Sequence, residues 1–196
     1  MKIDKHLEDS FFDSLPEYMK FSEEEKQEIV DLDVFRIVKK GTILLKEGQR
    51  SDKNYFVFKG CLRAYYIIDG EEKTTSFYTE MDGFAPPCTV NNQPSEFFLS
   101  CVEDSIIAEM STDMITAMLE KYPKNESYCR IFTERLLAKE QALFDEFKTS
   151  TPEQRYLNLL KTRPDLIQRV PQHQLASFLG IKPQSLSRLK ARVLKK

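Results

Sequence analysis

Residues 172–193 read QHQLASFLGIKPQSLSRLKARV, and this stretch decides how the C-terminal part of the chain folds. Leu175 and Leu179 are spaced to share one side of a short helix, which Gly180 can end with a positive φ. Pro183 suits the first position of a second helix, because no backbone N–H is needed there. The pattern predicts a helix-turn-helix, whose structural positions are Ala176, Gly180, Leu186 and Leu189.

The second helix, expected over residues 183–194, has a polar face without an acidic residue. Arginine pairs with guanine and glutamine with adenine through two hydrogen bonds, whereas more distal lysine and arginine side chains suit phosphates. We therefore expect this face to bind DNA through Lys182, Gln184, Ser185, Ser187, Arg188, Lys190 and Arg192. Two amphipathic helices of an ordinary bundle are the alternative interpretation of the same spacing.

The net charge of −2 over 196 residues conceals a strong asymmetry. Residues 150–196 hold ten Lys and Arg against two acids, which gives +8, and residues 1–149 hold nineteen against twenty-nine, which gives −10. A basic segment on an acidic body is typical of a protein in which one domain binds nucleic acid. The acidic body would repel DNA and confine the contact to the C-terminal segment.

The composition favours a cytoplasmic protein without a membrane partner. Apolar residues make up 41% of the chain and charged residues 31%, and no run reaches the roughly 18 apolar residues of a membrane helix. The first residues lack the apolar core of a signal peptide. We expect the protein to remain in the cytoplasm.

Cysteine and histidine usage indicates neither a cofactor, nor a metal, nor an enzyme. The four cysteines, Cys61, Cys88, Cys101 and Cys129, are scattered without a Cys-x-x-Cys pair, so we expect small buried hydrophobes. The two histidines, His6 and His173, lie far apart in the sequence. A metal enzyme with a cupin-like barrel would need a histidine cluster, so no catalytic residue is assigned.

The middle of the chain predicts a β-structure. Short apolar runs between residues 34 and 110 alternate with glycine turns at intervals of about 8–12 residues, which is typical of a barrel or sandwich. Ser22 and Glu25 have the spacing of a capping box and predict a preceding helix, and a short helix is expected after Ser111. Residues 86–94 contain three prolines and are expected to form a connecting loop.

A long helix is predicted over residues 124–149, because nothing in that stretch breaks a helix. Its apolar seam is expected to form a dimer interface through Phe132, Leu136, Leu143 and Phe147. Lys139 interrupts the seam, and a helix buried within one core is the alternative. Thr151 and Pro152 then mark a new helix start, where the charge of the chain also changes sign.

Four short motifs carry a resemblance to a known family: Lys39-Lys40-Gly41, Glu47-Gly48, Tyr55-Phe56-Val57 and Gly60. Joined to the C-terminal pattern, they resemble the Crp–Fnr family of bacterial transcription regulators. The resemblance implies an α+β fold class, with an N-terminal antiparallel β-roll (jelly-roll-like) domain, a long dimerisation helix and a C-terminal all-α helix-turn-helix domain. The expected boundaries are 1–120, 121–149 and 150–196. The segment before the helix-turn-helix looks too short for the β-hairpin wing of many members.

The resemblance implies three partners for the protein: double-stranded DNA, a second copy of the chain as a homodimer, and RNA polymerase. It also implies a small-molecule effector, whose identity the sequence leaves unknown. The family's cyclic-nucleotide cassette, Gly-Glu-Leu followed by Arg-Ser/Thr-Ala, is missing from residues 82–98. No Lys or Arg occurs between Thr74 and Glu120, whereas eight acids do, so a phosphate would meet repulsion there. Arg63 and Lys73 are the nearby cations that could line a shifted effector pocket.

The leading hypothesis is a transcription regulator that binds a palindromic operator as a homodimer, independently of cyclic AMP. The alternative is a β-roll protein-interaction or ligand-sensing module whose helical tail binds a partner protein.

Overall fold

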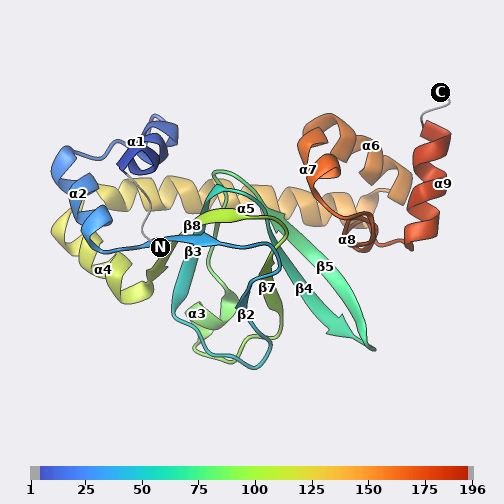
Figure 1. The fold of residues 1–196 in the computed structure, drawn as a ribbon, viewed down its shortest axis with the longest axis horizontal. Helices are drawn as coiled ribbons and strands as arrows, with labels where there is room; N and C mark the ends of the chain where they lie inside the picture. The colour runs from blue at the N-terminus through green and yellow to red at the C-terminus, as the bar shows by residue number, and fades with distance from the viewer. Residues whose placement is uncertain (1–4, 194–196) are drawn as a thin grey trace.

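The computed structural model of the chain describes residues 5–193 (Figure 1). The strands are β1 (Phe35–Val38), β2 (Ile43–Leu45), β3 (Lys53–Lys59), β4 (Leu62–Ile68), β5 (Glu71–Tyr78), β6 (Gly83–Phe84), β7 (Phe98–Cys101) and β8 (Ser105–Ser111). The helices are α1 (Lys5–Ser14), α2 (Glu23–Asp31), α3 (Pro87–Asn91), α4 (Thr112–Lys121), α5 (Asn125–Thr149), α6 (Pro152–Thr162), α7 (Pro164–Arg169), α8 (Gln172–Phe178) and α9 (Pro183–Val193).

The strands form two four-stranded antiparallel sheets, ordered β1-β8-β3-β6 and β2-β7-β4-β5. Alternate residues of a strand point to opposite faces, so β3 sends Tyr55 and Val57 between the sheets and Phe56 and Phe58 outward. The space between the sheets is filled by buried side chains that include Leu45, Leu62, Tyr78, Phe97, Leu99 and Ile107. The predicted fold class, a β-roll followed by a long helix and C-terminal helices, is confirmed.

Helices α1, α2 and α4 cover the outer face of the first sheet. The Phe11 ring of α1 meets the Phe35 ring edge-on at 4.9 Å between centroids. Helix α2 begins with the predicted capping box, in which the Ser22 N–H donates to the Glu25 carboxylate at 2.7 Å. Helix α1 was not predicted, because its apolar positions carry no cap that distinguishes them from a tail.

Glu25 is fully buried and ties α2 to the start of α5. Its carboxylate accepts from the Lys124 ammonium at 2.8 Å and from the Asn125 amide nitrogen at 2.9 Å. Burial favours the neutral acid, but the bonds from Lys124, Ser22 and Asn125 outweigh it and lower the pKa of Glu25 to about 2. The buried charge is therefore paired at the junction of these two helices.

Helix α5 runs past the β-domain, from the N-terminal helices to α6 and α8 (Figure 1). Phe132 packs on the β-domain of its own chain, where a Cβ at Gly83 would lie 2.6 Å from the Phe132 ring. Leu136 borders the same region, beside Gly83. On the opposite side, Leu137 and Phe144 are 67% and 61% exposed. Part of the predicted dimer seam thus faces its own chain, while two neighbouring apolar side chains face outward.

The loop expected over residues 86–94 contains the short helix α3, which starts at Pro87. Proline is well suited to a first helical position, so the prolines that predict a loop here also allow a short helix to start. None of the helices within residues 5–193 is long and apolar enough to cross a membrane.

Candidate nucleic-acid interface

The turn of the helix-turn-helix is a Schellman motif. The N–H of Gly180 donates to the Ser177 carbonyl at 3.0 Å, and the N–H of Ile181 donates to the Ala176 carbonyl at 2.9 Å. Gly180 has a φ of 72°, and a Cβ there would meet the Phe147 ring at 3.3 Å. Helix α9 follows from Pro183, the first helical position that the sequence predicted.

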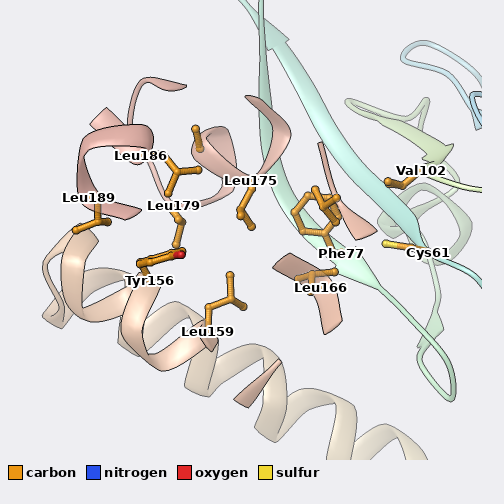
Figure 2. Close-up of a cluster of buried hydrophobic side chains, with 12 residues drawn as sticks. Cys61, Phe77, Val102, Tyr156, Leu159, Leu166, Leu175, Leu179, Leu186 and Leu189 are labelled. Carbon is orange, nitrogen blue, oxygen red and sulfur yellow. The ribbon is translucent and has the colours of Figure 1, made fainter. Parts of the chain in front are cut away.

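Both helices of the motif are held by one apolar core. Leu175, Ala176 and Leu186 are fully buried, and Leu189 is 6% exposed. Figure 2 shows these leucines gathered with Tyr156 and Leu159 of α6. Because α9 rests on this core through one face, its other face is held outward in a fixed orientation.

The exposed face of α9 carries most of the residues predicted to bind DNA. Lys182, Gln184, Ser185, Ser187 and Arg188 are all exposed, and Lys190 is half-buried. Arg192 forms an ion pair with Glu153 of α6, and the sequence did not predict this interaction. Position 194, the last residue of the expected helix, lies outside the described residues. The first two turns of α9 therefore present one amide, two hydroxyls and one guanidinium to the surroundings.

The C-terminal helices pack against the second sheet of the β-domain. Strand alternation sends Leu62 into the β-roll and places the neighbouring Cys61 in the same buried cluster as the leucines of α8 and α9 (Figure 2). Phe77 of β5 meets Phe178 of α8 at 5.3 Å between ring centroids. The second sheet is therefore covered on both faces, and its outer face positions the helix-turn-helix.

Polar contacts reinforce this junction. Ser177 of α8 accepts from the Thr74 N–H at 2.9 Å and donates to the Glu72 carbonyl at 2.8 Å. Arg163 donates to the Thr79 hydroxyl at 2.9 Å, and Arg169 donates to the Glu80 carboxylate at 2.7 Å. The side-chain hydrogen bond to Glu80 raises the pKa of Arg169 above its ordinary value.

These contacts change the interpretation of the charge asymmetry. Arg163 and Arg169 contribute to the excess of +8, yet both bind residues of the β-domain. Arg155 likewise donates to the Leu179 carbonyl at 2.8 Å and lies over the Phe147 ring at 4.5 Å. The basic side chains that remain on the exposed surface of the helix-turn-helix include Lys182 and Arg188.

The two residues expected at an effector pocket lie on the β4–β5 hairpin beside the helix-turn-helix. Arg63 is 2% exposed and bonds Thr74 at 2.8 Å and Glu72 at 2.5 Å. Lys73 pairs with Glu71. Both line a cavity of about 830 Å³ that Lys182 and Gln184 of α9 also border, so they face away from the interior of the β-roll. The sequence alone did not show that Arg63 and Lys73 face away from the β-roll. That conclusion requires strand alternation together with the position of α8.

The cysteines carry no arrangement for metal chemistry. Cys61, Cys88 and Cys101 are buried, as predicted, whereas Cys129 on α5 is exposed. Burial raises the pKa of the Cys61 and Cys101 thiols to about 12, so both remain protonated at neutral pH. Across the described range, 5–193, no group of three His, Cys, Asp or Glu side chains could hold a metal ion.

Comparison with known proteins gives a family for the β-domain and a fold for the chain. Residues 35–122 match the model of the cyclic nucleotide-binding domain. No curated protein matches the sequence. The c-di-GMP-responsive global regulator CLP of Xanthomonas campestris is similar, with 15% identity and a TM-score of 0.65 over 82% of this chain and 86% of that one.

Two further solved structures have the same architecture. FixK2 from Bradyrhizobium japonicum is 15% identical, with a TM-score of 0.66 over 82% of this chain and 84% of that one. A mutant of CooA from Carboxydothermus hydrogenoformans is 17% identical, with a TM-score of 0.64 over 82% and 76% of the two chains. The chain thus contains a cyclic nucleotide-binding domain over residues 35–122 and has the fold of the Crp–Fnr regulators that its motifs resemble.

Proposed function

We propose that the protein is a transcription regulator that binds a palindromic DNA site as a homodimer through α9. The observation that carries the proposal is the exposed face of α9, where Gln184, Ser185 and Arg188 stand next to one another on a helix fixed by its buried side. These are side chains that hydrogen-bond base edges, and Lys182 at the start of the helix suits a phosphate. The described residues 150–193 form helices and turns only, so the proposed contact uses no β-hairpin wing.

The proposed dimer forms along α5. A single helix-turn-helix offers a small contact with DNA, so two copies spaced about one helical turn, roughly 34 Å, supply the required affinity. Phe132 is occupied by its own β-domain, whereas Leu137 and Phe144 lie seven residues apart on one exposed side of the helix. Exposed large apolar side chains at this spacing favour a second α5 as the partner.

Cyclic AMP is not part of the proposed mechanism. The interior of the β-roll is filled by rings: Tyr78 stacks on Phe84 at 4.5 Å, and Phe84 meets Phe97 at 5.9 Å. Helix α3 occupies the segment where the cassette motifs are missing, and it contains no cation. Arg50 reaches the end of α3, but its guanidinium donates to the Asn92 carbonyl. With the cassette arginine missing and Arg50 bonded to the Asn92 carbonyl, a phosphodiester would lose its water for little compensation.

Selection of bound sequences from a random duplex pool tests the function directly. We expect an enriched site with two inverted half-sites about one DNA turn apart. Arg188→Ala should weaken binding to that site by about 1–3 kcal/mol and relax base preference within each half-site. Arg50→Ala, a matched change on the β-domain, should leave affinity and preference as they are. An unaltered sequence preference for Arg188→Ala would refute the assignment of this residue.

The interaction-module alternative makes a different prediction for the same protein. A helical tail that binds a partner protein needs no affinity for nucleic acid, so random duplex DNA would migrate unretarded even at low salt. Retardation that weakens steeply as salt is added would instead support a phosphate contact, because bound cations release counterions.

A further inference from the structure

A cavity of about 380 Å³ lies where α5, β5, α6 and α8 meet (Figure 1). Thr75 and Ser76 line it from β5, the edge strand of the second sheet, and Phe178 lines it from the first helix of the helix-turn-helix. Ligand sites in proteins are concave spaces of about 300–1,000 Å³ that occur preferentially between domains. The size and the place of this cavity are therefore those of a ligand site, and it shares no lining residue with the buried cluster inside the β-roll.

One wall of the cavity is apolar and mostly aromatic. It is formed by Leu143, Phe144 and Phe147 of α5 together with Phe178. Phe144 and Phe147 are 61% and 49% exposed, so the chain itself leaves much of these two rings uncovered. Aromatic rings pack on one another edge-on or in offset stacks, with a gain beyond that of the buried area. This wall suits a ligand with an aromatic body.

Four charged side chains also line the cavity, and three of them are bonded within the chain. Arg155 and Arg163 donate to acceptors of their own chain, and Glu146 accepts from the Asn158 amide nitrogen at 2.8 Å. Glu140 differs from these three, because its carboxylate accepts no hydrogen bond and forms no ion pair with any residue between 5 and 193. The cavity thus has one charged group whose partner is missing.

The surroundings of Glu140 indicate what that partner is. The side chain is half-buried, and burial raises the pKa of its carboxyl above the ordinary value. The neighbouring Lys139 cannot compensate for the lost water, because it pairs with Asp82. A partly desolvated carboxylate gains most from a cation that brings N–H donors, since such bonds are about twice as strong as neutral ones. The missing partner is therefore an ammonium group.

We propose that this cavity binds a small cationic amine, whose ammonium donates to Glu140 and whose aromatic body packs on Phe144 and Phe147. The ring of Phe147 also lies beside Gly180, in the turn of the helix-turn-helix. A ligand on this wall would thus contact the residues that support α8 and α9. The role of the site as an effector site rests on the proposed function; its ability to bind an amine does not.

Equilibrium dialysis of the intact chain against three probes with the same ring system tests the site. The probes are 1-naphthylmethylammonium, which is a cation, 1-naphthylmethanol, which is uncharged, and 1-naphthylacetate, which is an anion. We expect the ammonium to bind saturably at one molecule per chain, the alcohol to bind about tenfold more weakly, and the acetate not to bind, because only the first supplies charge-assisted donors. Equal affinity for the ammonium and the alcohol, or no saturable binding of the ammonium, would overturn the proposal.

A matched pair of variants on α5 tests the role of Glu140. Glu140→Gln keeps the size of the side chain and removes its charge, so the affinity for the ammonium should fall about tenfold and that for the alcohol should stay the same. Glu134→Gln is the control, because Glu134 is an exposed partner of Arg130 and does not line the cavity. An equal loss in both variants would show a general attraction to the acidic surface and would refute the site.

A second pair of variants, on α6, locates the probe. Asn158 lines the cavity and Lys161 does not, and both are exposed. Asn158→Trp should lower the affinity for the ammonium and the alcohol at least about tenfold by filling the cavity, whereas Lys161→Trp should leave both unchanged. Full affinity in the Asn158 variant would place the probe elsewhere and refute the proposal. Glu140→Gln supplies the decisive result if the Asn158 variant unfolds.

The ligand assay and the DNA assay fail independently. Amine binding requires no DNA, so loss of the regulator hypothesis leaves its outcome intact. Absence of amine binding in a protein that still selects a palindromic site would refute this cavity alone. An operator affinity that shifts at least about threefold with saturating 1-naphthylmethylammonium would support an effector role, and a constant affinity would refute that role.

Discussion

Arg169 and Glu80 form a two-point ion pair across the junction between α7 and the β-domain. The Nη1 atom lies 2.8 Å from one carboxylate oxygen and Nη2 lies 2.7 Å from the other. Arg169 also donates to the Glu103 carboxylate at 3.0 Å and to the Gly60 carbonyl at 2.8 Å. Burial favours the neutral form of Glu80, but the bonds from Arg169 and from the Gly60 N–H leave its pKa below the ordinary value. One guanidinium thus joins three turns of the β-domain to the segment that precedes α8.

Removing this guanidinium should loosen the junction. Arg169→Ala is expected to lower the free energy of unfolding by about 1–2 kcal/mol, because charge-assisted bonds are lost but the partners are partly exposed to water. Cleavage by a protease between α5 and α6 should become faster. Urea unfolding and limited proteolysis measure the two effects.

Arg130→Ala provides the control, because Arg130 forms an exposed pair with Glu134 one turn away on α5. That pair should contribute only about 0.3–0.5 kcal/mol. Equal stability of the Arg169 and Arg130 variants would show that the junction does not depend on the ion pair.

A charge on the outer side of α5 should prevent dimer formation. Leu137 is 67% exposed, so Leu137→Glu should leave the monomer folded but would bury a carboxylate in a dimer. Sedimentation equilibrium should show a dimer for the wild type and a monomer for the variant, with much weaker DNA binding. Val90→Glu, at another exposed apolar position on α3, should remain dimeric. A wild-type protein that sediments as a monomer at micromolar concentration would rule out this dimer.

Cyclic nucleotides should leave the protein unaffected. Titration calorimetry with cyclic AMP and cyclic GMP should show no heat of binding up to millimolar ligand, because aromatic rings pack inside the β-roll and α3 itself carries no cation. The affinity for the selected DNA site should be the same with and without either nucleotide. Saturable binding in the low micromolar range, coupled to tighter DNA binding, would contradict this prediction.

Acid should weaken the N-terminal junction through Glu25. Its pKa is lowered from 4.5 to about 2 in the folded protein, so the native state binds its proton less readily than the unfolded chain does. The resulting stability is fully present above about pH 4.5 and is lost as the pH falls toward 2. Denaturant unfolding from pH 6 to pH 2 should show a stability gap between wild type and Glu25→Gln that narrows over this window. A gap that stays constant would mean that Glu25 does not titrate as described.

The sequence predicted the elements with local signals. Gly180 and Pro183 mark the turn and the start of α9, because backbone conformation alone limits which residues fit there. The capping box at Ser22 and the capping Thr151 with Pro152 open α2 and α6 for the same local reason. The exposed residues of α9 also follow from helical periodicity once the helix is placed.

Tertiary structure decided which side chains contact another part of the chain. Arg169 counts toward the basic excess of residues 150–196, yet it pairs with Glu80, 89 positions away. Phe132 reads as a dimer contact, yet Gly83 leaves room for its ring on the β-domain. Asn125 falls at the beginning of the predicted helix 124–149, yet its amide nitrogen donates to Glu25, 100 positions away. Local sequence limits a backbone through sterics and hydrogen bonds between neighbours, whereas the partner of a side chain depends on residues that only the folded chain brings within contact distance.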